Sequence, residues 1–354
     1  MIRRQGAEWR ALVRYNRWSV AIEQHMKTFS TSLDRRRFLQ WSSGFLVAST
    51  AAGRSMAAVS GAINRSAGIQ LFTMQSALAQ DFKGTLDTLA RIGYRRVETL
   101  GLLGHDPKEF RKALDNAGLS VPSLHIISEA AEALFLGMAQ GIIPPEIAWQ
   151  KIVDSMNLSG IDQMMNYMLI QSKVFGNQYL VLAAVDGAVF DSDSGLEMVI
   201  AAYTKAGEMC HQRGVKFAFH PHLSEFRKVN GKRPVDAILQ ATDPAKVFVE
   251  LDYFWAAMAD TDIPAFLERY SGRFRLGHVK DIAKDFVVPA GGFREISEIP
   301  PEAFADIGYG RMDYRKLIAL GRKAGIELFF VERDVAPDPI NNAKRSYGNL
   351  KLML

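Results

Sequence analysis

Two histidines and a glutamate follow a short apolar run in the segment FAFHPHLSEF, residues 217–226. His220 and His222 are two positions apart, so both lie on one face of an extended strand. Three later apolar runs end in polar pairs with the same spacing: Glu250 and Asp252, His278 and Lys280, and Glu332 and Asp334. Two earlier runs contain Glu98 and His125. This recurrence indicates side chains that converge on a common point.

Mixed imidazole and carboxylate ligands suit a divalent transition ion such as Mn²⁺, Co²⁺ or Zn²⁺. Such an ion polarises a carbonyl, and nearby imidazoles or carboxylates can move a proton on and off the adjacent carbon. Each residue could also have a purely structural role, because a histidine at a strand end often makes a structural hydrogen bond. Asp281 and Asp334 could be helix N-caps. Polar endings on four consecutive strands nevertheless favour one metal site.

Eight short β-rich runs alternate with amphipathic helical stretches after residue 68, and we predict strands at 69–75, 96–100, 121–126, 179–185, 216–220, 247–252, 275–281 and 328–334. Alternating strands and helices imply a parallel sheet covered by helices. Eight such units predict an α/β fold, a closed (β/α)8 TIM barrel spanning residues 67–354. An open doubly wound sheet is the alternative, but no predicted strand is followed by a glycine-rich phosphate loop.

Two connections are longer than a barrel requires. Residues 127–162 predict a helical insertion after the third strand, and residues 282–313 a long loop after the seventh. Both follow strand C-termini, where barrels build active sites, so they are candidates for a lid or a substrate pocket wall.

Residues 1–66 have the character of an N-terminal extension with an export signal. Arg35, Arg36 and Arg37 precede a weakly apolar stretch rich in small residues, the pattern of a twin-arginine signal peptide. We therefore expect the twin-arginine export machinery as a partner and a periplasmic or secreted protein without a stable membrane anchor. An N-terminal basic amphipathic helix is the alternative.

The net charge of +5 comes from the leader. Residues 1–58 hold ten Lys/Arg and three Asp/Glu, out of 43 and 38 in the whole chain. The remainder therefore has a small negative excess, which argues against nucleic-acid binding. The single cysteine, Cys210, cannot form an internal disulfide and suits a buried helix position. Assembly into a homo-oligomer is left open.

The segments GVKFAFHPHLSEF, FVELDYFWA, GRFRLGHVKD and FFVERD together resemble the sugar phosphate isomerase/epimerase family of xylose isomerase-like TIM barrels. The resemblance implies one divalent ion held by a Glu, an Asp, a His and a Glu from the fifth to eighth strands. Three of these correspond to Asp252, His278 and Glu332. His220 stands at the fifth-strand position, so either His220 or Glu225 is the fourth ligand. The resemblance further implies that His222 is a proton-transfer base and that Lys280 lies near a substrate oxygen.

The function expected from this pattern is an exported, metal-dependent sugar isomerase or epimerase. His222 or Glu332 would remove a proton beside a carbonyl to give an enediolate, which Lys280 and the ion stabilise. The alternative is a 3-keto-glycoside lyase that uses the same first step. A nuclease of the same superfamily and a non-catalytic sugar- or metal-binding barrel are further alternatives.

Overall fold

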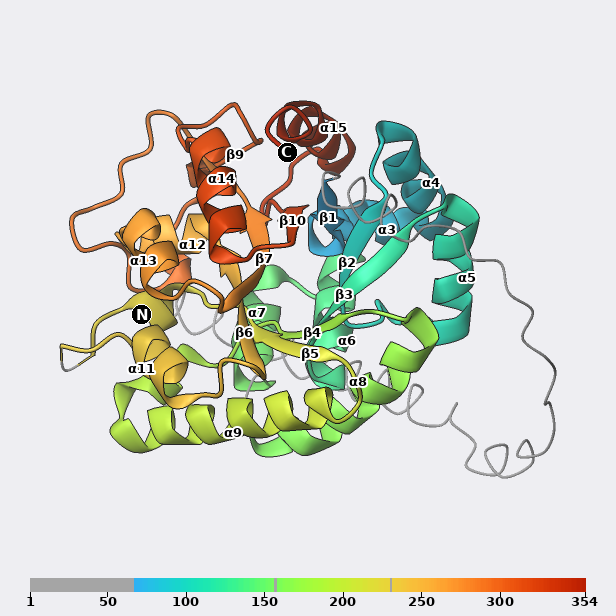
Figure 1. The fold of residues 1–354 in the computed structure, drawn as a ribbon. Helices are drawn as coiled ribbons and strands as arrows, with labels where there is room; N and C mark the ends of the chain where they lie inside the picture. Colours follow the sequence, from blue (N-terminus) through green and yellow to red (C-terminus); the bar gives the residue numbers. More distant parts are fainter. Residues whose placement is uncertain (1–66, 156–157, 230) are drawn as a thin grey trace, which may run out of the picture. The chain divides into compact units, whose positions relative to one another are not determined.

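A closed barrel of eight parallel strands forms the centre of the part of the chain that the structure describes, residues 67–155, 158–229 and 231–354 (Figure 1). In this computed structural model the strands have the spatial order β1-β10-β7-β6-β5-β4-β3-β2, and every neighbouring pair is parallel. The barrel strands are β1 (Gly68–Gln70), β2 (Arg96–Leu100), β3 (Ser120–Ile126), β4 (Tyr179–Leu182), β5 (Lys216–Phe219), β6 (Val247–Asp252), β7 (Phe274–Val279) and β10 (Leu328–Val331). The predicted (β/α)8 barrel is confirmed.

All eight predicted strands are present, but several are shorter than predicted. β1 ends at Gln70, whose side chain accepts a hydrogen bond from the backbone N–H of Phe72 and so begins a 3-10 helix, Leu71–Met74. β10 ends at Val331, so Glu332 and Asp334 lie just beyond it. The polar residues therefore sit where the strands give way to the loops of the barrel mouth.

The helices of the described residues are α3 (Gln75–Gln80), α4 (Phe82–Ile92), α5 (Pro107–Ala117), α6 (Glu129–Ala139), α7 (Pro145–Ser155), α8 (Ile161–Phe175), α9 (Asp193–His211), α10 (Leu223–Phe226), α11 (Pro234–Ala241), α12 (Tyr253–Met258), α13 (Ile263–Arg269), α14 (Tyr314–Ala324) and α15 (Pro339–Leu350). α5 shows how local sequence sets their bounds. The Asp106 carboxylate caps its first turn, and Gly118, with a φ of 70°, ends it. Phe110 and Leu114 lie on its buried face.

The two long connections have the predicted character. α6 and α7 form the helical insertion between β3 and α8. The segment after β7 contains a two-stranded antiparallel sheet, β8 (Asp281–Ile282) with β9 (Phe304–Ala305). Phe304 stacks on Phe254 of α12 with ring centroids 4.5 Å apart, and Trp255 belongs to the same buried cluster. The long loop is therefore anchored next to α12.

Side-chain alternation divides the barrel strands into a helix-facing set and a lumen-facing set. On β6, Val247, Val249 and Leu251 join the core between strands and helices, whereas Phe248 belongs to a separate buried cluster. That second cluster also contains Ala218, Leu276, Leu328 and Phe330, each two or four residues before a polar strand-end residue. An apolar layer thus fills the lumen below the polar residues.

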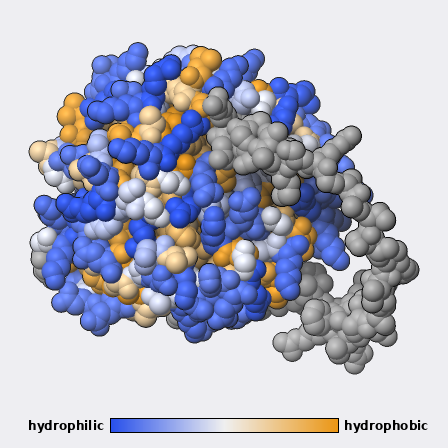
Figure 2. All heavy atoms as spheres, in the orientation of Figure 1, coloured by the Kyte–Doolittle hydropathy of each residue, from blue (hydrophilic) through white to orange (hydrophobic). Residues whose placement is uncertain are grey.

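The predicted leader, residues 1–66, lies outside the described residues. Among those that are described, none of the helices combines the length and apolar character needed to cross a bilayer. On the face drawn in Figure 2, hydrophilic residues predominate and hydrophobic residues lie between them in small groups.

Candidate metal centre

Histidine and carboxylate side chains gather in the barrel lumen in two overlapping groups. The outer group is His220, Asp252, His278 and Glu332, and the inner group is His125, His220, Glu250 and His278. Within each group, one potential ligand atom per residue lies within 4.8 Å of all the others, and all six residues are buried. Glu250 precedes Asp252 by two residues on β6, so the inner group lies deeper in the barrel.

The outer group brings together residues from four consecutive barrel strands. His278 Nδ1 lies 2.7 Å from Glu332 Oε2 and 4.0 Å from Asp252 Oδ2, and His220 Nε2 lies 3.6 Å from Asp252 Oδ2. Asp252 Oδ1 accepts hydrogen bonds from the backbone N–H groups of Phe254 and Trp255, which fixes the carboxylate at the start of α12. Its other oxygen, Oδ2, is buried and faces the Lys280 ammonium at 2.8 Å.

Lys280 lies among three carboxylates beside the outer group. Its Nζ is 2.8 Å from Asp252 Oδ2, 2.7 Å from Glu332 Oε2 and 2.9 Å from Asp334 Oδ2. Burial lowers the pKa of this amine, but the three carboxylates together raise the pKa well above its usual value. Lys280 is therefore a buried ammonium, and Nζ also lies 4.9 Å from the Trp255 ring centroid.

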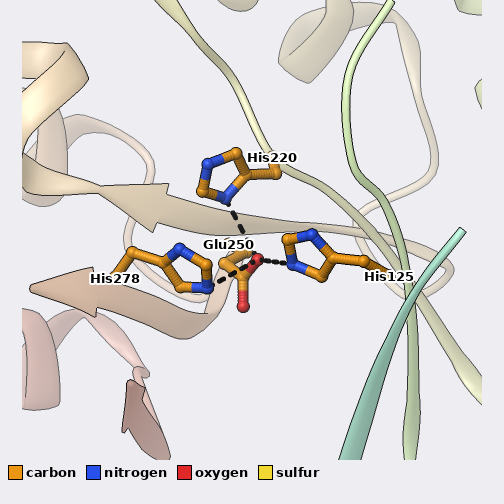
Figure 3. A group of neighbouring side chains, drawn as sticks. All are labelled: His125, His220, Glu250 and His278. Atoms are coloured by element: carbon orange, nitrogen blue, oxygen red, sulfur yellow. Dashed lines mark hydrogen bonds and ion pairs between the residues drawn. The ribbon is translucent and has the colours of Figure 1, made fainter. Parts of the chain in front are cut away.

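Three imidazoles converge on the Glu250 carboxylate in the inner group (Figure 3). Glu250 Oε2 lies 2.6 Å from His125 Nε2, 3.1 Å from His220 Nδ1 and 3.3 Å from His278 Nε2. Glu98 Oε2 lies beside them, 2.5 Å from His278 Nε2 and 3.1 Å from His125 Nε2. Burial lowers the pKa of His125, but Glu98 and Glu250 outweigh this and raise it to about 9.

His222 and Glu225 lie at the start of α10. The His222 ring centroid is 4.8 Å from that of His220 and 5.3 Å from that of Trp255, and His222 Nδ1 is buried without a hydrogen-bond partner. Burial, followed by the charge of Lys280, lowers the pKa of His222 to about 3. A neutral imidazole at this position can accept a proton.

Glu225 does not join either group in the structure. Its Oε2 accepts hydrogen bonds from the backbone N–H of His222, at 3.1 Å, and from Ser224 Oγ, at 2.8 Å. Burial raises the pKa of this carboxyl to about 7. The carboxylate faces the first turn of its own helix, while His220 is the fifth-strand residue that the structure brings to the outer group.

The structure brings several side chains into the site for which the sequence predicts no role in binding or catalysis. The sequence pattern marks Glu98, His125 and Glu250 as polar strand residues without predicting a binding or catalytic role for them, and it predicts none for Trp255. Asp281 and Asp334 are not helix N-caps. Asp281 accepts backbone N–H groups of Gly308, Gly310 and Met312. The two-residue alternation of the strand could have placed Glu250 in the site, because it lies two positions before Asp252.

The donor set fits a divalent cation. Across the two groups, Glu98 and Asp334, five carboxylates lie together with three imidazoles and one ammonium. Imidazole nitrogens with carboxylate oxygens are ligands that Mn²⁺, Co²⁺ and Zn²⁺ accept.

A separate cavity of about 780 Å³, lined by residues that include Arg227, Arg233 and Arg294, contains no member of either group.

Comparison with known proteins agrees with this architecture. The family model described as xylose isomerase-like TIM barrel matches residues 86–351. An inosose dehydratase from Salmonella agona (strain SL483) is 22% identical over 245 residues, which is 67% of this chain and 76% of that protein.

Solved structures show the same fold. A sugar phosphate isomerase/epimerase from Parabacteroides distasonis ATCC 8503 has a TM-score of 0.61 at 22% identity, covering 81% of this chain and 94% of the other. A xylose isomerase-like TIM barrel protein from Mycobacterium smegmatis, solved in complex with magnesium, has a TM-score of 0.54 at 13% identity, covering 82% and 96%.

Proposed function

Because the chain belongs to the xylose isomerase-like TIM barrel family, we propose that it is a metal-dependent enzyme that removes a proton beside the carbonyl of a sugar or sugar-derived ketone. Returning the proton to the other face of the same carbon gives an epimerase, and returning it to the neighbouring carbon gives an isomerase. The convergence of four buried imidazole and carboxylate ligand atoms in the outer group, all within 4.8 Å of one another, is the observation that carries this proposal.

Four residues of the outer group would hold one divalent ion: His220, Asp252, His278 and Glu332. When bound, a Mn²⁺, Co²⁺ or Zn²⁺ ion supplies positive charge that polarises the substrate carbonyl. Glu225 is not needed as a ligand in this arrangement, because its carboxylate caps α10.

His222 is the side chain best placed to accept the proton. Its Nδ1 is buried without a partner, and its ring lies beside Trp255. Lys280 would stabilise negative charge that develops on a substrate oxygen, since its ammonium borders the outer group. Glu332, which Lys280 and His278 both contact, is the alternative proton acceptor. The Trp255 indole would form an apolar wall with one donor, Nε1, that has no protein partner.

A lyase is the second candidate, favoured by the inosose dehydratase among the relatives. If a hydroxyl or glycosidic oxygen lies on the carbon next to the deprotonated one, it can leave as a double bond forms. His222, having taken the first proton, could return it to the departing oxygen, so the same residues suffice. A 3-keto-glycoside would be a substrate of this type.

Deuterium exchange tests the proposal. Purified protein loaded with Mn²⁺, Co²⁺ or Zn²⁺ is incubated in D₂O with a panel of keto-sugars, 3-keto-glycosides and cyclitol ketones. We expect deuterium at the carbon beside the carbonyl, and we expect it to be lost in His222→Ala and Asp252→Asn. Release of water or of an aglycone identifies the lyase. A complete lack of exchange across the panel would refute both reactions.

We also propose that the protein is exported by the twin-arginine pathway, on the basis of Arg35, Arg36 and the stretch that follows them. Mass spectrometry of the N-terminus of the protein from a bacterial periplasmic fraction tests this. Cleavage near residues 57–67 supports export, and an intact N-terminus in the cytoplasm contradicts it. Changing Arg35 and Arg36 to Lys should then block export.

A further inference from the structure

His278 and His220 each present one ring nitrogen to the outer group and the other to a buried glutamate. His278 Nδ1 faces Glu332 at 2.7 Å, and its Nε2 faces Glu98 at 2.5 Å. His220 Nε2 faces Asp252 at 3.6 Å, and its Nδ1 faces Glu250 at 3.1 Å. The two rings therefore use opposite nitrogens toward the outer group.

A neutral imidazole has one N–H and one nitrogen lone pair, and only the lone pair can bind a metal ion. A carboxylate accepts hydrogen bonds and cannot donate them when it is ionised. With an ion on Nδ1 of His278 in place of the contact with Glu332, Glu98 would hold the remaining ring proton on Nε2. With an ion on Nε2 of His220, Glu250 would likewise hold the remaining ring proton on Nδ1.

The two glutamates have few other donors. Glu98 Oε2 also accepts from Gln70 Nε2, at 3.0 Å, and both carboxylates share His125 Nε2, at 3.1 Å and 2.6 Å. Glu250 Oε2 also lies 3.3 Å from His278 Nε2. Both are fully buried, and their Oε1 atoms have no hydrogen-bond partner. Below them Phe330 packs 6.2 Å from the His278 ring centroid, at the apolar layer of the lumen.

From this geometry we infer that Glu98 and Glu250, linked by His125, are positioning residues that fix the ring forms of His278 and His220 for metal binding. The ion would bind Nδ1 of His278 and Nε2 of His220. The inner group is thus a support for the outer site and does not hold an ion of its own. This inference rests on the proposed metal site in the outer group.

Binding of Co²⁺ to the purified protein tests the inference, with affinity measured by competition against a chromophoric chelator and geometry by visible absorption. Carboxylate partners of metal-bound histidines typically contribute about 10–100-fold to metal affinity. We expect Glu98→Gln and Glu250→Gln each to weaken Co²⁺ binding by about this factor and to alter the absorption spectrum. Asp252→Asn and Glu332→Gln, which remove ligands, should weaken it further.

Glu327→Gln provides the matched control. Glu327 precedes β10, whereas Glu332 follows it. The Oε2 atom of Glu327 accepts a hydrogen bond from the Tyr179 hydroxyl at 2.9 Å. This variant should bind Co²⁺ like the wild type. Circular dichroism should show that each variant is folded before its affinity is compared.

Nuclear magnetic resonance of protein labelled with ¹⁵N-histidine and loaded with Zn²⁺ gives a readout independent of affinity. One metal-bound histidine should carry its proton on Nε2 and the other on Nδ1, and assignment by His220→Asn should identify the latter as His220. In Glu250→Gln, the His220 signals should shift or broaden while those of His278 keep their form.

The outcomes separate the two proposals. If wild-type protein binds no Co²⁺ or Zn²⁺, the proposed metal function fails. If Asp252→Asn and Glu332→Gln weaken binding but Glu98→Gln and Glu250→Gln do not, only the positioning role is refuted. If the inner variants abolish binding and the outer variants leave it intact, the ion lies in the inner group and the inference is wrong.

Discussion

Lys280 has unusual surroundings for a lysine. It is 1% exposed, and its positive charge is surrounded by Asp252, Glu332 and Asp334. Separation of the ammonium from water strengthens each of these interactions. The same charge lowers the pKa of His222, after burial itself, which keeps that imidazole neutral. One side chain thus balances the outer carboxylates and keeps the adjacent imidazole unprotonated.

Replacing Lys280 with methionine tests its proposed role in the reaction. Methionine is similar in length but has no charge, so we expect deuterium exchange into substrate to slow by about 10²–10³-fold. Metal binding should persist or become tighter, because three carboxylates lose their competing cation. Lys246→Met, at a half-buried pair with Glu208, is the control. Wild-type exchange in Lys280→Met would contradict this role.

At the scale of the elements, α10 depends on Glu225, whose carboxyl has a pKa raised from 4.5 to about 7 by burial. A raised carboxyl pKa means that the folded protein binds more protons than the unfolded chain between these values. The contribution of Glu225 to the free energy of unfolding should therefore fall as pH rises from about 4.5 to about 7, by roughly 3 kcal/mol in total, and stay at the lower value above that range.

Glu225→Gln should remove this dependence while keeping an oxygen that accepts the His222 N–H. We expect the variant to gain stability relative to the wild type between pH 5 and pH 8, by about 2–3 kcal/mol. Urea unfolding at both pH values measures it. If the free energy of unfolding changes with pH in the same way in both proteins, the Glu225 carboxyl titrates normally and the prediction is wrong.

The loop of residues 306–312 depends on Asp281. This buried carboxylate accepts the backbone N–H groups of Gly308, Gly310, Met312 and Ile282 at 2.9–3.1 Å. Asp281→Ala leaves these donors without their acceptor, at a cost of about 3 kcal/mol or more. We expect a lower unfolding midpoint and faster amide hydrogen exchange at Gly308, Gly310 and Met312. Unchanged exchange there would show that the loop is held by other contacts, and Asp281→Asn should have a smaller effect.

Sequence pattern predicted the elements better than it predicted the partners of each side chain. The run VFVELD matches β6 residue for residue, because its apolar character and alternation both describe a strand buried on two faces. The local sequence could not show that Glu225 turns back onto its own helix, or that Asp281 holds a distant loop. Those contacts depend on chain geometry beyond the strand. The convergence of His220, Asp252, His278 and Glu332 was foreseeable, since all four lie on one face at one end of a parallel barrel.

At the scale of the whole molecule, the site joins segments that are far apart in the chain. Glu98 and His278 are 180 residues apart, and His125 and Glu250 are 125 apart. β1 meets β10 through only two paired positions, Gly68 with Phe330 and Ile69 with Val331. A cation bound by the outer group would link β5, β6, β7 and β10, four adjacent strands of the barrel.

Metal removal should lower the stability of the protein. A ligand present at about 100 times its dissociation constant stabilises the folded state by about 2.7 kcal/mol. We expect chelation to lower the thermal unfolding midpoint and Co²⁺ or Zn²⁺ to restore it. Asp252→Asn should show little response to either treatment. Equal midpoints with and without metal in the wild type would argue that the outer group binds no ion in the folded protein.

The position of Trp255 gives the protein an intrinsic optical probe. The chain has five tryptophans, and three of them, Trp9, Trp18 and Trp41, precede the expected cleavage region. Processing there would leave Trp149 and Trp255, so a Trp149→Phe variant emits from a single indole. That indole borders both an ammonium and an imidazole. Its fluorescence yield should therefore change when a metal ion or a substrate enters the lumen, and stopped-flow fluorescence could measure the rate of binding without an added label.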